Sequence, residues 1–418
     1  MIGVALAMIP LVLGAAEEFE GIRITVGLED ADIIGDDNRA IQAAIDYVAG
    51  LGGGVVEIGE GEYLIEDSIH LRSNVTLIGK GESTILVKSD GFQSKLVMDG
   101  DYGEEQITVA DPSGFEVGTG VTILDDRSGG FHVTVATIIG VKGNTLKINK
   151  PLLADYLVTA NARAQNTFPI ISGYYVENVR IENITIDGNR EKNPPITGCR
   201  GAGIFLYRAK NVHISNCVVR NYNGDGISFQ QSEDVVIEGC VVTDNSAYGI
   251  HPGSGSRRPI VRNNKSLRNS IGIFVCWRVK EGIFEDNEIC DNEKAGVSIG
   301  HKDTDNVFRD NLIARNGIYG ILFREELEPM GAHRNLIEDN QIIDNGSEGK
   351  GYGIYINGET HDVRIIGNSI EGSPYGIYIC PGATRIIVRD NKFIRCSAEG
   401  IHIESTESQV ELSGNEVR

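Results

Sequence analysis

The sequence is poor in proline, tryptophan and aromatic residues in general. Its 418 residues include 11 Pro and one Trp, and aromatic residues make up 6%. The scarcity of Pro excludes a collagen, and 41% hydrophobic residues exclude a disordered chain. Seven Cys, an odd number in a long chain, exclude a disulfide scaffold. Basic residues are also few, 38 against 59 acidic ones, and a net charge of −21 makes nucleic acid an unsuitable partner.

Long apolar runs are absent except at residues 2–15, IGVALAMIPLVLGA. This run is too short to span a bilayer comfortably and is typical of the core of an export signal, although it lacks a basic segment before it. We therefore expect residues 1–16 to be a truncated signal segment of a secreted or periplasmic protein, with no membrane span. A terminal strand or arm that packs on the domain is the alternative.

Glycine, in contrast, is abundant and periodic. From residue 200 onward a Gly followed by Ile or Val recurs at Gly203, Gly226, Gly249, Gly272, Gly296, Gly320, Gly353, Gly376 and Gly400. Strand side chains alternate between faces, so the residues one and three positions after each Gly point inward. A unit of about 23 residues buries its apolar face only when it stacks on others. The repeat predicts a solenoid of parallel strands, in which Asn residues at equivalent turns can hydrogen-bond along the stack.

This repeat resembles the right-handed parallel β-helix of the pectate-lyase-like (pectin lyase fold) superfamily, and the resemblance covers most of residues 30–418. The segment DDNRAIQAAIDYVAGLGGGVVEIGEGEYLI resembles the start of that fold: a short helix, a Gly-rich turn and the first strands. Asp37 is expected to cap this helix. Its apolar stripe would cover the end of the core and comprises Ala40, Ile41, Ala44, Ile45 and Val48. The fold class is therefore all-β, a β-helix solenoid with an N-terminal capping helix.

The repeat is interrupted in residues 100–165. The segments GFEVGTGVTILDD, HVTVATIIGV and NTLKINKPL alternate like antiparallel hairpin strands, with turns at Gly129-Gly130 and Gly143-Asn144. We predict an inserted small β subdomain there, with the cap and first coils in residues 17–99 and the main β-helix in residues 166–418. The extra residues ELEPMGAHRN lengthen the coil after Gly320 into a loop.

Candidate functional residues lie on the outward positions and adjoining turns of the coils from Gly226 to Gly320, because unlike polar residues occupy corresponding places there. The expected catalytic residues are Asp225, His251, His301, Lys302, Asp303 and Arg324. The expected substrate-binding residues are Arg257, Arg258, Trp277, Asp305, Glu325, Glu326 and His333. Arginine forks bind carboxylates, so an acidic, uronate-containing polysaccharide is the expected partner. The alternative is that these charges pair with one another on a solvated surface.

Two reaction classes compete, and partial motifs accompany both. In elimination or epimerisation of a uronate, His251, His301 or Lys302 would be the base, and Arg324 with Arg257 or Arg258 would stabilise the anion. The segment Tyr248–Pro252 resembles part of the alginate epimerase motif, with His251 where that family has Asp. Asn223-Gly224-Asp225-Gly226 resembles a polygalacturonase motif, but that family's second Asp is missing. Glycoside hydrolysis, and a non-catalytic glycan-binding protein, are the alternatives.

No cofactor is expected. Asp303 and Asp305 are the residues that would hold Ca²⁺ if one were bound, although acidic turn pairs are common without a metal. Cys217 and Cys240 occupy equivalent places in neighbouring coils, and we expect them to be buried thiols rather than a disulfide.

Overall fold

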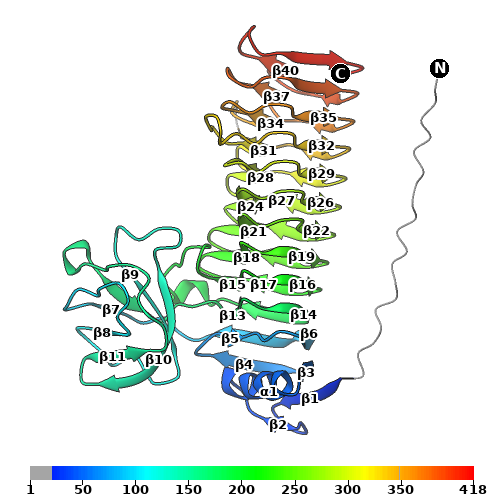
Figure 1. The fold of residues 1–418 in the computed structure, drawn as a ribbon. Coiled ribbons are helices and arrows are strands. Elements are labelled where there is room, and N and C mark those ends of the chain that lie inside the picture. Colours follow the sequence, from blue (N-terminus) through cyan, green and yellow to red (C-terminus); the bar gives the residue numbers. More distant parts are fainter. Residues whose placement is uncertain (1–20, 348) are drawn as a thin grey trace.

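The computed structural model describes residues 21–347 and 349–418, and the expected signal segment 1–16 lies outside them. The chain winds into a tall solenoid in which successive coils lie on one another from the N-terminal to the C-terminal end (Figure 1). The strands of these coils occupy three columns along the solenoid, so the predicted β-helix is confirmed.

One column, which we call the front sheet, is a 12-stranded parallel sheet with one strand per coil along most of its length. Its register aligns the repeat, since Ile204 pairs with Ile227 and Ile227 with Ile250. Its strands are β5 (Ile69–His70), β13 (Ile171–Tyr174), β15 (Ala202–Tyr207), β18 (Asp225–Gln230), β21 (Tyr248–Ser254), β24 (Ile271–Phe274), β25 (Cys276–Trp277), β28 (Ala295–Ile299), β31 (Tyr319–Phe323), β34 (Tyr352–Ile356), β37 (Tyr375–Ile379) and β40 (Glu399–Ile403).

The other two columns form one 24-stranded sheet, because the long strands β6 and β14 cross both. The first column contains β1 (Ile22–Gly27), β3 (Gly54–Ile58), β6 (Val75–Lys88), β14 (Glu177–Asp187), β16 (Lys210–Ser215), β19 (Glu233–Glu238), β22 (Ile260–Arg262), β26 (Ile283–Glu285), β29 (Val307–Arg309), β32 (Leu336–Glu338), β35 (Arg364–Ile366), β38 (Ile386–Arg389) and β41 (Val410–Ser413). The remaining strands are β2 (Ile33–Ile34), β4 (Gly61–Ile65), β17 (Val218–Arg220), β20 (Val241–Thr243), β23 (Lys265–Leu267), β27 (Glu288–Cys290), β30 (Leu312–Ala314), β33 (Gln341–Ile343), β36 (Ser369–Glu371), β39 (Lys392–Ile394) and β42 (Glu416–Val417).

The core of the solenoid is a continuous column of aliphatic and aromatic side chains. The inward positions after each repeat Gly, such as Ile227, Phe229, Ile250 and Ile321, are fully buried. Cys217 and Cys240 are buried free thiols, as predicted. The outward positions between the inward ones are thereby left to carry polar side chains on the front sheet.

Helix α1 (Asn38–Gly50) closes the N-terminal end of this core (Figure 1). The side chain of Asp37 accepts hydrogen bonds from the backbone N–H groups of Arg39 and Ala40, which confirms the predicted cap. Ile41, Ala44, Ile45 and Val48 of the predicted stripe are buried against the solenoid, and Ala40 is partly buried.

The inserted subdomain protrudes from the side of the solenoid beside β13 and β15 (Figure 1). It is a six-stranded antiparallel sheet with its own hydrophobic core. Its strands are β7 (Gln93–Lys95), β8 (Gln106–Thr108), β9 (Gly120–Leu124), β10 (Thr134–Lys142), β11 (Thr145–Ile148) and β12 (Arg163–Gln165). It begins at β7 rather than at residue 100, because β7 pairs with β12 at the other end of the insertion.

Buried asparagines join the turns of successive coils, as the repeat predicts. Each side chain bonds backbone groups of the preceding coil, and all but the last Asn of a ladder donate to the next Asn, as in the 2.9 Å bond from Asn311 Nδ2 to Asn340 Oδ1. One such ladder comprises Asn264, Asn287, Asn311, Asn340, Asn368, Asn391 and Asn415. Another comprises Asn245, Asn269, Asn292, Asn316 and Asn345. These ladders satisfy backbone groups that the turns would otherwise leave buried without partners.

We expect Asn311→Ala to lower the free energy of unfolding by about 2–4 kcal/mol. The substitution removes the partners of the Asn287 N–H and the Phe284 carbonyl, which Asn311 bonds at 3.0 and 2.9 Å, and both groups stay buried. Denaturant titration measures the loss. Asn415→Ala, in the last coil of the same ladder and partly exposed, is the control. Equal losses in the two variants would contradict a burial-dependent ladder.

Candidate functional site

The polar cluster of the front sheet is built by β18, β21, β24, β25, β28 and β31 and by the turns that follow the last three strands. Its open part, which we call the Arg324 cluster, comprises Trp277, His301, Arg324 and Glu326, with Asp303 buried beneath Arg324. Its covered part is the Asp225–His251 pair. Consecutive coils thus bring together residues that the sequence spreads over about a hundred positions, as predicted from the repeat.

Arg324, directly after β31, is fixed by several contacts. Its Nη1 donates to Ser298 Oγ at 2.8 Å and its Nη2 donates to the carbonyl of Val275, also at 2.8 Å. The guanidinium lies over the ring of Phe274, 4.6 Å from the centroid. The side chain is 16% exposed and Nε is buried without a hydrogen-bond partner. The cation is therefore held in one orientation at the surface of the front sheet.

His301 lies beside this cation in the turn after β28. Its Nε2 is 2.9 Å from Glu326 Oε1, and its ring stacks on Trp277 with centroids 4.9 Å apart. Its Nδ1 has only long contacts, 3.4 Å to Arg324 Nη2 and 3.4 Å to Cys276 Sγ. Burial, and next the positive charge of Arg324, lower the pKa of His301. A neutral His301 whose Nε2–H donates to Glu326 presents the Nδ1 lone pair beside the guanidinium.

Asp303 is fully buried behind Arg324. Its carboxylate accepts from the backbone N–H groups of Val279 at 2.9 Å and Gly300 at 3.0 Å, and it lies 3.4 Å from Arg324 Nη2. Burial raises the pKa of Asp303 to about 7, although Arg324 acts in the opposite direction. Asp303 supports the turn and the cation from below rather than facing a ligand.

The raised pKa of Asp303 predicts a pH dependence of stability. The folded state keeps this proton from about pH 4, where the unfolded carboxyl loses it, up to about pH 7. Asp303 therefore contributes stability that is present below pH 4 and is lost as the pH rises towards 7. We expect the Asp303→Asn variant to have a flatter stability profile across this window, measured by denaturant titration between pH 4 and 8.

Asp305 provides the matched control for this titration. Arg334 forks onto its carboxylate at 2.7 and 2.8 Å and lowers its pKa, so its contribution is lost only as the pH falls below 4. Asp305→Asn should leave the slope between pH 4 and 7 unchanged. A profile for Asp303→Asn that parallels the parent protein would contradict the assignment.

Asp225 and His251 form a buried pair. Asp225 Oδ2 lies 2.6 Å from His251 Nδ1, and His251 Nε2 lies 3.3 Å from the carbonyl of Cys276. Their side chains are 1% and 5% exposed. Residues 193–201 cover them, and Gly198 lies so close that a Cβ there would collide with the Asp225 carboxylate and His251 Nδ1. The pair is therefore shielded from a bound polymer.

Phe274 joins the two parts of the site. Tyr248 stacks on one side of it at 3.9 Å, His251 meets it edge-on at 5.1 Å, and Arg324 lies over the ring. Phe274, Cys276 and Ser298 are not among the residues predicted from the sequence. All three occupy the same outward columns as His251 and Arg324, and this shared position is the signal that could have found them.

The structure does not bring every predicted residue to this site. Arg258 pairs with Asp234 at 2.7 Å and Arg257 approaches Glu281 at 3.5 Å, on a turn outside the front sheet. Asp305 is occupied by Arg334. His333 stacks on His361, with centroids 3.5 Å apart. The ion-pair alternative therefore holds for Arg257, Arg258 and Asp305.

Two further predicted residues border the cluster. Lys302 follows His301, and its backbone N–H donates to the carbonyl of Met330 at 2.7 Å. Glu325 is exposed between Arg324 and Glu326. The predicted Ca²⁺ ligands Asp303 and Asp305 face different arginines, Arg324 and Arg334, so their carboxylates do not form a joint oxygen site.

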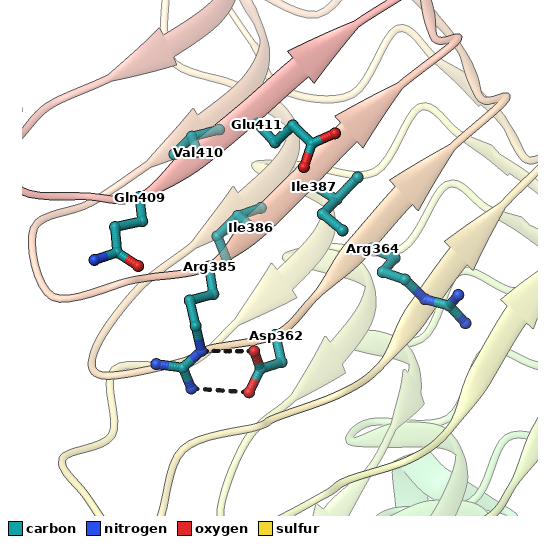
Figure 2. A pocket seen from close by; sticks show the side chains of 8 residues that line it. All are labelled: Asp362, Arg364, Arg385, Ile386, Ile387, Gln409, Val410 and Glu411. Atoms are coloured by element: carbon teal, nitrogen blue, oxygen red, sulfur yellow. Dashed lines mark hydrogen bonds and ion pairs between the residues drawn. The ribbon is translucent and has the colours of Figure 1, made fainter.

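A surface hollow of about 550 Å³ lies elsewhere, over the last coils (Figure 2). It is lined by Asp362, Arg364, Arg385, Ile386, Ile387, Gln409, Val410 and Glu411. Asp362 and Arg385 form a bidentate pair beside it, and none of its lining residues belongs to the Arg324 cluster.

Comparison with known proteins places this geometry in a family. The family described as "Right handed beta helix region" matches residues 115–266, 169–326 and 329–417. The chain belongs to this right-handed β-helix family. No curated protein sequence matches it. Among the described residues, no helix is long and apolar enough to cross a membrane.

Solved structures with the same fold share little sequence with the chain. An exopolygalacturonase from Thermotoga maritima is 16% identical with a TM-score of 0.60, and the matched region covers 93% of this chain and 92% of the exopolygalacturonase chain. The A-module of mannuronan C-5 epimerase AlgE6 from Azotobacter vinelandii is 18% identical with a TM-score of 0.55, covering 92% and 96%. The AlgE4 A-module from the same organism is 18% identical with a TM-score of 0.53, covering 94% and 97%. At these identities the similarity establishes the fold.

Proposed function

We propose that this β-helix protein is an exported enzyme that acts on an acidic, uronate-containing polysaccharide by removing the proton next to the carboxylate. The observation that carries the proposal is the placement of the fixed Arg324 guanidinium 3.4 Å from Nδ1 of His301. A guanidinium binds a sugar carboxylate with two parallel hydrogen bonds. The carbon next to that carboxylate would then lie close to the Nδ1 lone pair. The epimerases and the exopolygalacturonase of the same fold are consistent with this substrate class.

Each exposed group has a role in such a reaction. His301 Nδ1 accepts the proton, while Glu326 at Nε2 orients the ring and stabilises the imidazolium that forms. The electron pair of the broken C–H bond moves into the carboxylate, where Arg324 stabilises the added charge. Trp277, 45% exposed, offers its indole to the sugar ring. Lys302 and Glu325 flank the Arg324 cluster. Elimination then expels the neighbouring glycosidic oxygen, which takes up a proton from water, whereas epimerisation adds a proton from water to the opposite face of the same carbon.

His301 is a better base than His251 in this arrangement. Its side chain is 30% exposed, against 5% for His251, and its pKa is lowered so that the neutral form is present at neutral pH. Asp225 and His251 then act as a support beneath Phe274. Hydrolysis needs two carboxyl groups flanking the scissile bond. Asp225 and Asp303 are both buried, which disfavours this alternative.

The specific observation that favours hydrolysis is the raised pKa of Asp303, since general acids of glycosidases have this property. A direct assay separates the candidates. The full chain is incubated in D₂O with polymannuronate, polygalacturonate and a neutral glucan. Elimination produces ultraviolet-absorbing unsaturated ends, epimerisation incorporates deuterium at the carbon next to the carboxylate, and hydrolysis releases reducing ends alone. Reducing ends without either other signal would overturn the proposal, and binding without any product would indicate a glycan-binding protein.

A further inference from the structure

The loop inserted after β31 carries a second cluster of functional side chains. Glu328 and His333 lie on this loop, and His361 lies on the corresponding turn of the next coil. One ligand atom from each of the three residues falls within 4.8 Å of the others. Glu328 Oε1 is 2.8 Å from His361 Nε2 and 3.3 Å from His333 Nε2. The Arg324 cluster uses none of these residues.

His333 contributes a buried nitrogen without a partner. Its side chain is 9% exposed, and its Nε2 has no hydrogen bond, because the 3.3 Å approach to Glu328 lacks hydrogen-bond geometry. A buried polar atom of this kind is costly, and native proteins satisfy nearly all of them. The unused nitrogen faces the same point as the Glu328 carboxylate, which indicates a ligand at that point.

His361 is oriented from behind by a carboxylate. Its Nδ1 lies 2.7 Å from Asp362 Oδ2. Asp362 is itself held by the fork of Arg385, whose Nε and Nη2 donate to it at 2.7 and 2.8 Å (Figure 2). When the Nδ1–H of His361 donates to Asp362, the lone pair of Nε2 remains available to bind a metal ion. This carboxylate–histidine arrangement is the usual outer support of a metal-bound imidazole.

We propose that Glu328, His333 and His361 bind a divalent transition metal of the zinc type. Two imidazoles, one carboxylate and a fourth position for water suit Zn²⁺, whereas Ca²⁺ prefers oxygen ligands alone. Ligands on a tetrahedral Zn²⁺ lie roughly 3–3.5 Å apart. The distances from Glu328 Oε1 to Nε2 of His361 and to Nε2 of His333, 2.8 and 3.3 Å, are already close to this spacing. The proposal does not depend on the reaction proposed for the Arg324 cluster.

Binding requires a small rearrangement of the two rings. They now stack with an interplanar angle of 13°, so their Nε2 lone pairs run side by side and must tilt towards each other. Coordination at His333 Nε2 also moves its proton to Nδ1. The 3.2 Å contact in which the His361 N–H donates to that Nδ1 is therefore given up. Glu328 is exposed on the loop and can move to complete the site.

Such a metal would join the inserted loop to the next coil. The loop is already bonded to that coil by the Glu359 N–H, which donates to the carbonyl of Glu326 at 2.7 Å, and by the Glu328 N–H, which donates to Glu359 Oε2 at 2.6 Å. A bond from Glu328 through the metal to His361 adds a further link. Because Glu326 contacts His301, the metal would also fix one wall of the Arg324 cluster.

The test is direct metal binding by the full chain after removal of metal with a chelator. We expect calorimetric titration with ZnCl₂ to give one site per chain, and CoCl₂ to produce the visible absorption of a tetrahedral site. Glu328→Gln and His361→Ala should each abolish the site. Asp362→Asn should weaken it by about 10- to 100-fold, because it removes only the support of His361.

The matched control is His402→Ala. His402 lies 2.8 Å from Glu399 but belongs to no group of three metal-ligating side chains among the described residues, so its loss should leave the stoichiometry at one. Glu328 is exposed, so Glu328→Gln remains informative if a His333 variant fails to fold. The absence of a Zn²⁺ or Co²⁺ site, or a site that persists in both Glu328→Gln and His361→Ala, would overturn the proposal. Because no substrate is used, this failure is distinguishable from failure of the proposed reaction.

Discussion

Replacing Arg324 by alanine should lower the turnover of a uronate polysaccharide by about 10²- to 10³-fold, the loss typical of removing one group that stabilises a developing anion. Arg324 is the fixed cation beside His301, and among the described residues no other guanidinium makes a hydrogen-bond contact with His301. The measurement is kcat and KM for the parent protein and the variant on the substrate identified by the D₂O assay. The loss should fall mainly on kcat, because the charge that Arg324 stabilises grows in the transition state.

Folding should survive this substitution. Without Arg324 the pKa of Asp303 rises further, since that cation is the largest of the influences that lower it, and the buried carboxyl becomes neutral instead of remaining an unpaired charge. Arg324→Lys keeps the charge but not the fork, and should recover part of the activity. Arg334→Ala, which removes an exposed guanidinium bound to Asp305, is the control and should retain full activity. An Arg324→Ala variant with parent-level kcat would exclude Arg324 from the chemistry.

The fold can be predicted from the sequence because a stacked coil repeats one physical requirement. Each coil needs an inward Ile or Val at the same place, such as Ile227 and Ile250, and an Asn at the turn, such as Asn287 and Asn311. These residues recur at nearly constant spacing, so the sequence alone indicates the columns. It does not indicate the start of the insertion, because β7 is a short strand whose assignment depends on pairing with β12 some seventy residues later.

The same columns predicted where His251, His301 and Arg324 would meet. The columns did not predict the positions of Arg257 and Arg258. These two residues lie past the end of the strand, where the backbone turns and Arg258 has a positive φ of 52°. A second periodicity could have shown this. Three ion pairs join an aspartate to an arginine one coil later, at separations of 24, 29 and 23 residues: Asp234–Arg258, Asp305–Arg334 and Asp362–Arg385. These arginines belong to an ion-pair ladder, which is the ordinary role of charges on a solvated turn.

Burial of the Asp225–His251 pair could not be predicted from any column. It arises from the covering segment 193–201, an irregular connection that no repeat describes. Ser228 Oγ donates to the carbonyl of Gly198 at 2.6 Å, and this bond holds the segment over the front sheet. His251 lies on the outward face of its strand, as the alternation of side chains predicts, but the covering segment removes it from solvent. We therefore propose that His251 supports the site instead of acting as the expected base.

This change of role has a large expected effect on stability. We expect His251→Ala to lower the free energy of unfolding by about 3–5 kcal/mol, because it leaves the Asp225 carboxylate buried without its partner. Asp225→Ala should cost a similar amount. The double variant should lose less than the sum, with a coupling energy of about 1–3 kcal/mol, because neither unpaired group then remains. Denaturant titration of the four proteins measures the cycle.

An exposed histidine–carboxylate pair, His402 and Glu399, tests whether burial causes the large coupling energy. His402 Nδ1 lies 2.8 Å from Glu399, but the two side chains are 32% and 53% exposed. Water replaces a lost partner there, so the corresponding cycle should give a coupling of less than about 1 kcal/mol. Similar coupling in the two cycles would show that the segment 193–201 does not exclude water from Asp225. In that case His251 would be accessible to a substrate, and it would compete with His301 as the base.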